Sequence, residues 1–323
     1  MIVDAHAHLV DRAYAEELTQ HLGLSVQRDP GGQTFLRGAH HSVLWFRDEF
    51  LSLDARLRRM DELGVTMRLL SLSTPNVYPW DGVAQVDVCR RSNDALLAAA
   101  QAHPDRFRAI ASLPLSDTEA ALAELDRVAA APGFAGVLIG SNVSGLQLDA
   151  QRFEPLWARL DAGRIPVIEH PMMPPEGDPA MQGYEMPLRV GLIYDTTTML
   201  TRMIYGGVFS RYPNFPMVVA HTGGALLSLL QRLDNGWRLF PDCRAHLDEP
   251  PSTVAKRLFF DTCAFSAPAL RMALEIVGPE HLLWGADDPF IGADTVHVRA
   301  LNLPAEQEAL ILGGNARRLF GLG

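Results

Sequence analysis

Hydrophobic and polar positions follow two alternating rhythms along the chain. Short runs of β-branched and other apolar residues are separated by longer segments in which apolar residues recur every three to four positions. The short runs predict strands over residues 2–5, 66–73, 108–113, 137–139, 166–169, 217–220, 258–261 and 282–286. The longer segments predict helices over residues 54–63, 87–102, 117–130, 154–162, 196–209, 225–233, 267–277 and 305–312. Eight strands alternating with helices are typical of a (β/α)8 TIM barrel.

The segment from about residue 22 to residue 46 breaks this alternation. Within it, LSVQRDPGGQTFLR indicates two short strands around a Pro-Gly-Gly turn. We therefore expect a small β-hairpin inserted after the first strand of a single domain spanning residues 1–323. The length of 323 residues suits one barrel of about 250 residues with insertions.

Charge and composition narrow the expected partners and compartment. Lys and Arg number 28 against 38 Asp and Glu, so the formal net charge is −10, and no basic run offers a footprint for nucleic acid. The start, MIVDAHAH, lacks the pattern of a secretion signal, and no stretch of about 18 apolar residues suggests a membrane partner. Three widely spaced cysteines, Cys89, Cys243 and Cys263, favour a reducing compartment. We expect a cytoplasmic protein.

Polar residues with metal-binding side chains follow several of the predicted strands. His6 and His8 are two positions apart at the end of the first strand, so both imidazoles point to the same face. His170 and His221 come directly after the fifth and sixth strands. Because active sites of barrels lie at the carboxyl ends of the strands, we expect these side chains to meet in one cavity.

An acidic pair follows the eighth strand and adds an anionic ligand to this set. Asp287 and Asp288 are neighbours, so their side chains point in opposite directions and only one can face the cavity. Nitrogen and oxygen donors with an open position suit a catalytic Zn²⁺ or a similar divalent ion. The spacing by itself decides neither which aspartate faces inward nor which donors bind the ion and which carry out acid–base chemistry.

Several motifs, taken in order, resemble a known family. They are H-x-H at 6–8, ARLRRMDELGV at 55–65, EHP at 169–171, AHTGG at 220–224, QRLDNGWR at 231–238, GADDPF at 285–290 and GNARRLFGL at 314–322. Together they resemble the amidohydrolase superfamily, and within it the branch of aminocarboxymuconate-semialdehyde decarboxylase and related non-oxidative aromatic-acid decarboxylases. The resemblance spans nearly the whole chain.

This resemblance implies roles for the strand-end residues. It selects Asp287 over Asp288 and leaves His221 unligated as the acid–base residue, with Asp287 as a further candidate for proton donation. A histidine at position 6, where many aromatic-acid decarboxylases have glutamate, favours zinc, with manganese as the alternative. The metal ligands that the resemblance implies are His6, His8, His170 and Asp287.

The lysine count favours one metal ion over two. Binuclear members of the superfamily bridge their metals with a carbamylated lysine on the fourth strand. The only lysine of this chain, Lys256, precedes the seventh strand, which places it at the opposite mouth of the barrel.

Substrate-binding residues are also implied. Arg47 in WFRDEF resembles a carboxylate-binding arginine of the family, and Arg232 in QRLDNGWR resembles an arginine donated across a dimer interface. A guanidinium fork binds a carboxylate in a bidentate manner. Tyr78 and Trp80, with Phe290, either form an aromatic wall over a planar substrate or simply pack their loops. We therefore expect a homodimer or larger homo-oligomer.

The leading hypothesis is a metal-dependent non-oxidative decarboxylase of a small aromatic or enol-type carboxylic acid. The alternative at the same site is hydrolysis or hydration of an ester, lactone, amide or activated double bond, because fold analogy does not separate these reactions. A binding barrel without catalysis or metal is a third hypothesis. Release of CO₂ without consumption of water distinguishes the first from the second.

Overall fold

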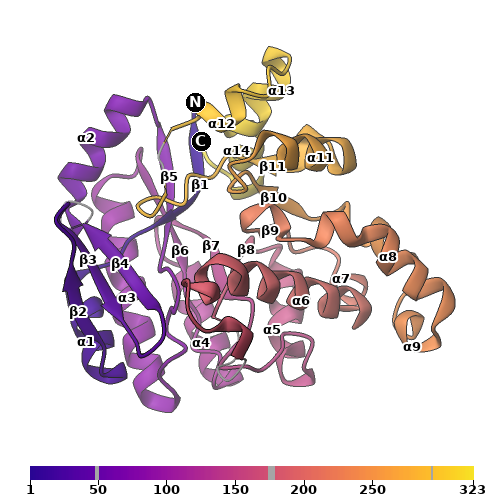
Figure 1. The fold of residues 1–323 in the computed structure, drawn as a ribbon, viewed down its shortest axis with the longest axis horizontal. Coiled ribbons are helices and arrows are strands. Elements are labelled where there is room, and N and C mark those ends of the chain that lie inside the picture. Colours follow the sequence, from indigo (N-terminus) through magenta and orange to yellow (C-terminus); the bar gives the residue numbers. More distant parts are fainter. Residues whose placement is uncertain (48–50, 174–178, 292–293) are drawn as a thin grey trace.

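Parallel strands form a central barrel that helices surround (Figure 1). The computed structural model describes the chain except residues 48–50, 174–178 and 292–293. Within the described residues, the strand order is β1-β5-β6-β7-β8-β9-β10-β11. These strands are β1 (Val3–His8), β5 (Met67–Ser71), β6 (Phe107–Ala111), β7 (Phe134–Gly140), β8 (Val167–His170), β9 (Met217–Val219), β10 (Phe259–Asp261) and β11 (Leu282–Leu283). Each predicted barrel strand is therefore confirmed.

Backbone hydrogen bonds join the two ends of this sheet. The segment after β11 runs beside β1: Ala5 N donates to Trp284 O at 2.9 Å, and Asp287 N donates to His6 O at 2.9 Å. His8 N also donates to the carbonyl of Asp288, at 2.7 Å. This closure confirms the TIM barrel and brings the end of the first strand next to the segment that follows the last.

Each of the eight segments predicted to be helical contains a helix, and the described residues form further helices as well. The α-helices of the described residues are α1 (Arg12–Leu22), α2 (Leu53–Leu63), α3 (Gly82–Ala102), α4 (Thr118–Ala129), α5 (Glu154–Gly163), α6 (Leu192–Tyr205), α7 (Val208–Arg211), α8 (Leu226–Leu239), α9 (Pro241–Arg244), α10 (Pro251–Ala255), α11 (Ala267–Val277), α12 (Val296–Arg299), α13 (Ala305–Ala309) and α14 (Asn315–Phe320). Side chains cap several first turns; Asp117, for example, accepts hydrogen bonds from the N–H groups of Glu119 and Ala120.

Several helix boundaries differ from the expected ones: α3 begins at Gly82 rather than at residue 87, and α8 ends at Leu239 rather than at residue 233. The helix predicted over residues 196–209 begins four residues earlier and divides into α6 and α7, because Gly207 has a positive φ of 69°. The pattern analysis also did not predict the short helices α9, α10, α12 and α14, nor α1, the helix that comes after β1. Asp11 caps that helix, and its buried side chains, Tyr14, Ala15 and Leu18, are too few to produce a long apolar period.

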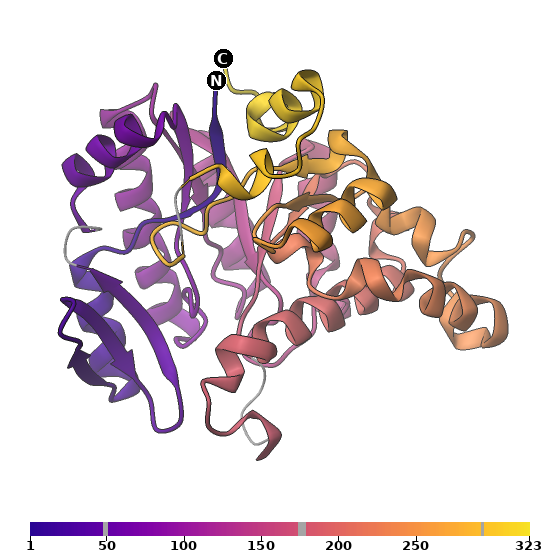
Figure 2. The same ribbon diagram turned by 45° about the horizontal axis from the view of Figure 1, so that its top comes forward.

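The inserted segment is larger than the predicted hairpin. Strands β2 (Ser25–Arg28) and β3 (Gln33–Arg37) pair as expected, and a third strand, β4 (Ser42–Arg47), extends them to an antiparallel sheet. Figure 2 shows this small sheet at the end of the barrel away from both chain termini. In β4, buried Leu44 and Phe46 alternate with Trp45, which faces the other side.

The hydrophobic core has two layers. Side chains such as Val3, Leu69 and Ile168 fill the inside of the barrel, and a larger layer lies between the strands and the helices. Burial on both faces explains why these strands form continuous apolar runs. Among the described residues, we find no helix with the length and apolarity needed to span a bilayer.

Candidate metal centre

Four potential ligands meet at the carboxyl end of the barrel strands. His6 and His8 lie in the second half of β1, His170 ends β8, and Asp287 comes four residues after β11. All four are buried, and one ligand atom of each lies within 4.8 Å of the corresponding atoms of the others. The expected strand-end cluster is therefore present, and it consists of the four residues that the family resemblance implied.

The two histidines of β1 are held with their Nε2 atoms toward the centre. The Nδ1 atom of His6 lies 2.6 Å from Asp261 Oδ2, and the Nδ1 atom of His8 lies 3.0 Å from Ser71 Oγ. The remaining ring nitrogens face each other, with 3.1 Å between His6 Nε2 and His8 Nε2. A hydrogen bond at Nδ1 of this kind fixes the tautomer of a histidine that binds a metal through Nε2.

The other two ligands complete the cluster from opposite sides. His170 Nδ1 lies 3.0 Å from Thr74 Oγ1, and its ring centroid is 4.7 Å from that of His8. Asp287 Oδ1 lies 3.5 Å from His6 Nε2 and 3.4 Å from His8 Nε2. Three imidazoles and one carboxylate crowded together in this way match the donor set of a divalent transition-metal ion.

The environment favours protonation states that suit metal binding. Burial lowers the pKa of His8 to about 4, and burial with neighbouring histidines holds the pKa of His170 well below its usual value. Burial alone raises the pKa of Asp287, but hydrogen bonds with His221 and His8 outweigh it and lower the pKa well below its ordinary value. Metal ligation requires such neutral imidazoles and an ionised carboxylate.

His6 differs, because its pKa is raised. Burial lowers the pKa of His6, but the hydrogen bond to Asp261 and the charges of Asp287 and Asp261 raise it to about 9. Buried anions therefore attract a cation to the Nε2 side of this ring. A metal ion and a proton compete for the same place.

His221 lies next to the four ligands without belonging to them. It follows β9, its Nε2 atom is 3.7 Å from Asp287 Oδ2, and its side chain is 13% exposed. Its backbone φ is 51°, and that of Thr222 is 55°. Asp261 supports this turn, because its Oδ1 atom accepts a hydrogen bond from Thr222 N at 2.9 Å. Left-handed backbone at non-glycine residues is concentrated at functional sites.

The neighbouring aspartates point in opposite directions, as the sequence predicted. Asp287, with a φ of 52°, faces the three histidines. Asp288 faces the helical layer instead, where its carboxylate contacts Arg56 and lies 2.8 Å from Arg68 Nη1. The left-handed turn and the ion pairs on its far side thus decide which carboxylate joins the centre.

A small cavity of about 50 Å³ opens above the cluster. Its described lining residues are Val43, Leu44, Trp45, Ser73, Thr74, His170, Met173, Leu188, Leu192, His221, Asp287 and Phe290. The ring of Phe290 packs between Trp45 and His8, at centroid distances of 5.0 and 5.5 Å. Sequence reasoning missed Trp45, because SVLWFR is apolar at four successive positions and its alternation appears only in the burial of the folded strand.

The other two aromatic candidates, Tyr78 and Trp80, are buried outside the described lining of the cavity. Tyr78 is buried, and its hydroxyl accepts a hydrogen bond from Gly140 N at 3.1 Å. The Trp80 ring stacks on His21 at a centroid distance of 4.9 Å. Neither residue is among the described lining of the cavity, and the choice between substrate wall and loop packing stays a prediction.

The two candidate arginines are also outside the described cavity lining. Arg47 is exposed at the end of β4, just before residues 48–50, which lie outside the described residues. Arg232 is exposed on α8. Since its expected place is in a neighbouring subunit's site, its role stays a prediction. Lys256 is exposed ahead of β10, at the amino-terminal end of the strands, as expected for a centre without a bridging lysine.

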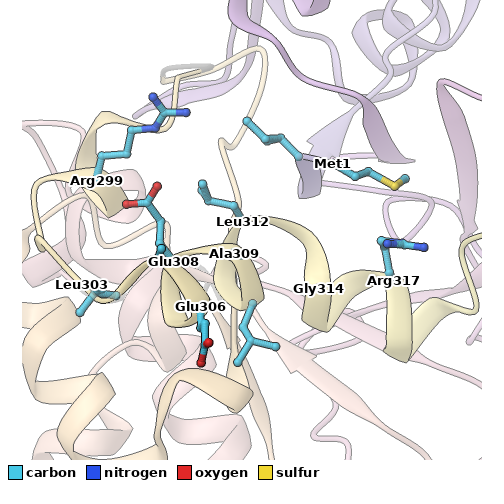
Figure 3. A pocket seen from close by; sticks show the side chains of 12 residues that line it. Met1, Arg299, Leu303, Glu306, Glu308, Ala309, Leu312, Gly314 and Arg317 are labelled. Carbon is cyan, nitrogen blue, oxygen red and sulfur yellow. The ribbon is translucent and has the colours of Figure 1, made fainter.

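A larger hollow, of about 910 Å³, lies near the chain start (Figure 3). It is formed by Met1, Ile2 and the segment from α12 to α14, and Arg299, Arg317, Glu306 and Glu308 supply its charged side chains. Its described lining includes no histidine or cysteine. The hollow therefore does not contain the metal-binding cluster.

Comparisons with known proteins agree with this geometry. A 2-amino-3-carboxymuconate-6-semialdehyde decarboxylase of Dictyostelium discoideum is 28% identical over 276 residues, which cover 83% of this chain and 76% of the relative. The structure of 5-carboxyvanillate decarboxylase LigW from Sphingomonas paucimobilis matches with a TM-score of 0.86 and 25% identity, covering 100% of this chain and 99% of that one.

A dihydroxybenzoic acid decarboxylase from Polaromonas sp. JS666, solved with bound manganese and the inhibitor 2-nitroresorcinol, matches with a TM-score of 0.81. Its identity is 24%, and the match covers 99% of this chain and 97% of that one, which shows a shared fold. The model of the amidohydrolase family matches residues 3–322. Because that match spans nearly the whole chain, the protein belongs to the amidohydrolase family.

Proposed function

We propose that this protein is a metal-dependent, non-oxidative decarboxylase of a small aromatic or enol-type carboxylic acid. The observation that carries the proposal is the buried cluster of three imidazoles and Asp287, with His221 beside it, under a cavity walled by Trp45 and Phe290. The decarboxylase names of the similar proteins support the reaction class.

In this proposal, one divalent ion binds to His6, His8, His170 and Asp287. When bound, it supplies Lewis-acid stabilisation of negative charge that develops on the substrate. We propose that the ion is zinc, because position 6 is a histidine. Manganese is the alternative, and it is the metal bound in the Polaromonas structure. We expect one ion per chain, because the described residues contain one cluster of four candidate ligands and Lys256 lies at the other end of the strands.

The proton needed for the reaction is assigned to His221 and Asp287. The bond between the carboxylate carbon and its neighbour breaks, the electron pair stays on the neighbouring carbon, and that carbon takes up one proton while CO₂ leaves. His221 Nε2 and Asp287 Oδ2 face each other at 3.7 Å, so the pair can hold a proton at the cavity. Imidazole is suited to such transfer near pH 7.

The cavity wall orients the substrate and excludes bulk water. Trp45 and Phe290 offer flat apolar surfaces to a planar ring, and Leu188 and Leu192 add apolar side chains to the same lining. An apolar enclosure keeps bulk water from the carbon that carries the electron pair, so protonation depends on the enzyme's own groups.

Arg47 and Arg232 are proposed to bind substrate carboxylate, Arg232 from a neighbouring subunit of a homodimer or larger homo-oligomer. Guanidinium pairs suit this task because they bind carboxylates in a bidentate manner. If the neighbour's arginine is needed, activity per chain falls when the protein is diluted into monomers. Equal activity in demonstrable monomers contradicts this assignment. The cytoplasmic placement also stays a prediction.

The experiment combines elemental analysis with a CO₂ assay. The purified protein is expected to contain about one metal ion per chain, lost in His6→Ala and Asp287→Ala, and to release CO₂ from a hydroxybenzoate or a muconate-type acid. His221→Asn should keep the metal and lose CO₂ release. Hydrolysis of an ester or lactone without CO₂ release supports the hydrolase alternative, and absence of metal from the native protein contradicts both.

A further inference from the structure

A second polar site lies on the other side of the Asp287–Asp288 turn, between the barrel and α2. A pocket of about 220 Å³ opens there, and we call it the arginine pocket. Its charged lining residues are Arg56, Arg58, Arg59, Glu62, Arg68 and Asp288. The metal centre uses none of these side chains.

The innermost member, Arg68, has unused hydrogen-bonding capacity. It projects outward from β5 and is 0% exposed. Its Nε lies 3.3 Å from Asp4 Oδ2 and its Nη1 lies 2.8 Å from Asp288 Oδ2. Among the described residues, Nη2 has no hydrogen-bond acceptor. A buried polar nitrogen without a partner is rare and indicates a bound water or ion.

The charge balance indicates which kind of ion. Among the described lining residues, four guanidinium groups face two carboxylates, those of Glu62 and Asp288, so these side chains together carry a formal charge of +2. When Asp4, which contacts Arg68 Nε, is counted as well, the net formal charge is still +1. The whole chain has a net charge of −10, so this positive pocket is a local exception. An anion is the ligand that its charge favours.

The outer rim supplies further cationic donors. Arg58 and Arg59 are exposed on α2, and within the described chain neither forms an ion pair. Their guanidinium groups therefore remain available to a solute from solvent. Planar guanidinium forks match the oxygen geometry of carboxylate and phosphate groups.

We propose that the arginine pocket binds a small oxyanion, either a tetrahedral one of the phosphate or sulfate class or a carboxylate. Arg68 Nη2 donates to it from the buried side, and Arg58 and Arg59 hold it from the solvent side. This proposal does not depend on the reaction at the metal centre.

Isothermal titration of the native, metal-containing protein tests it, with sodium sulfate and sodium acetate as separate probes. Sodium chloride keeps the ionic strength constant, because exposed charges are screened by salt. We expect one site per chain with a dissociation constant below about 1 mM for at least one probe. Tighter sulfate binding assigns the tetrahedral class, and tighter acetate binding assigns the carboxylate class.

Variants locate the binding. The exposed double change Arg58→Gln/Arg59→Gln should weaken binding about tenfold or more, as should Arg68→Lys, which lacks the second terminal nitrogen. Arg271→Gln, an exposed helical arginine on α11, is the matched control and should bind as the native protein does. Metal content checks that each variant is folded.

Two results overturn the proposal. One is the absence of saturable binding of either probe by the native protein. The other is binding that persists unchanged in Arg58→Gln/Arg59→Gln, which means an adventitious ion only, held at another place such as the metal centre.

Discussion

Asp261 is predicted to control metal affinity although it is not a ligand. Its Oδ2 atom is 2.6 Å from His6 Nδ1, and its Oδ1 atom accepts hydrogen bonds from the N–H groups of Thr222 and Cys263, both at 2.9 Å. In Asp261→Asn, the amide oxygen can keep the two backbone hydrogen bonds, so the amide nitrogen faces His6. That nitrogen only donates, so His6 Nδ1 must accept and the ring proton moves to Nε2. The proton then occupies the metal-binding position.

The expected size of the effect follows from this tautomer change. Loss of a side chain that hydrogen-bonds a metal-binding histidine weakens metal binding by about 10–100-fold, which corresponds to about 1.4–2.8 kcal/mol. Ser71→Ala removes a neutral hydroxyl from His8 Nδ1 and serves as the comparison. Its expected effect is below about tenfold, because a neutral hydrogen bond contributes about 1 kcal/mol.

The assay is competition for the metal between the protein and a chelator of known affinity, for native protein, Asp261→Asn and Ser71→Ala. Thermal unfolding of the metal-free proteins separates weaker binding from a loss of folding. The tautomer argument is refuted if folded Asp261→Asn binds the metal within about threefold of the native affinity, well under the tenfold minimum.

Three further predictions concern other parts of the molecule. Trp45→Ala should raise KM for the aromatic acid about tenfold with metal content unchanged, and an unchanged KM removes Trp45 from the substrate wall. Asp288→Asn leaves two buried arginines without their shared carboxylate and should lower the free energy of unfolding in urea by about 3–5 kcal/mol; a change below about 1 kcal/mol contradicts this. Burial alone raises the pKa of Glu154, but hydrogen bonds from Arg211 and Tyr212 lower it. Native protein should therefore be more stable than Glu154→Gln above pH 4.5, the ordinary value, and should lose this advantage as the pH falls below it, measured by thermal unfolding across that range.

The repeating pattern of the chain determined the barrel and the level at which its site lies. Parallel strands buried on both faces require continuous apolar runs, so runs such as those at residues 166–169 and 217–220 were visible without any long-range information. The first strongly polar residues after such runs, among them His170 and His221, were then expected at one end of the barrel, and the structure places them there.

Several decisions needed contacts between distant parts of the chain. The partner of His6 is Asp261, 255 positions away, and Asp261 looked like the ordinary end of a strand in the sequence. Likewise, the sequence pattern did not reveal β4. The two faces of this strand can be told apart only once β3 and the barrel are in place beside it. That packing put Trp45 at the cavity, whereas Tyr78 and Trp80 are not in its described lining.

The sequence by itself thus determined the barrel strands, their order and the set of polar strand ends, because periodicity and strand-end position are local properties of the chain. Only the tertiary structure decided the direction of each side chain at the centre. Closure between β1 and the segment after β11 sets Asp287 against the histidines, while Arg56 and Arg68 hold Asp288 on the opposite side. These are long-range hydrogen bonds and ion pairs, and no local pattern along the chain specifies them.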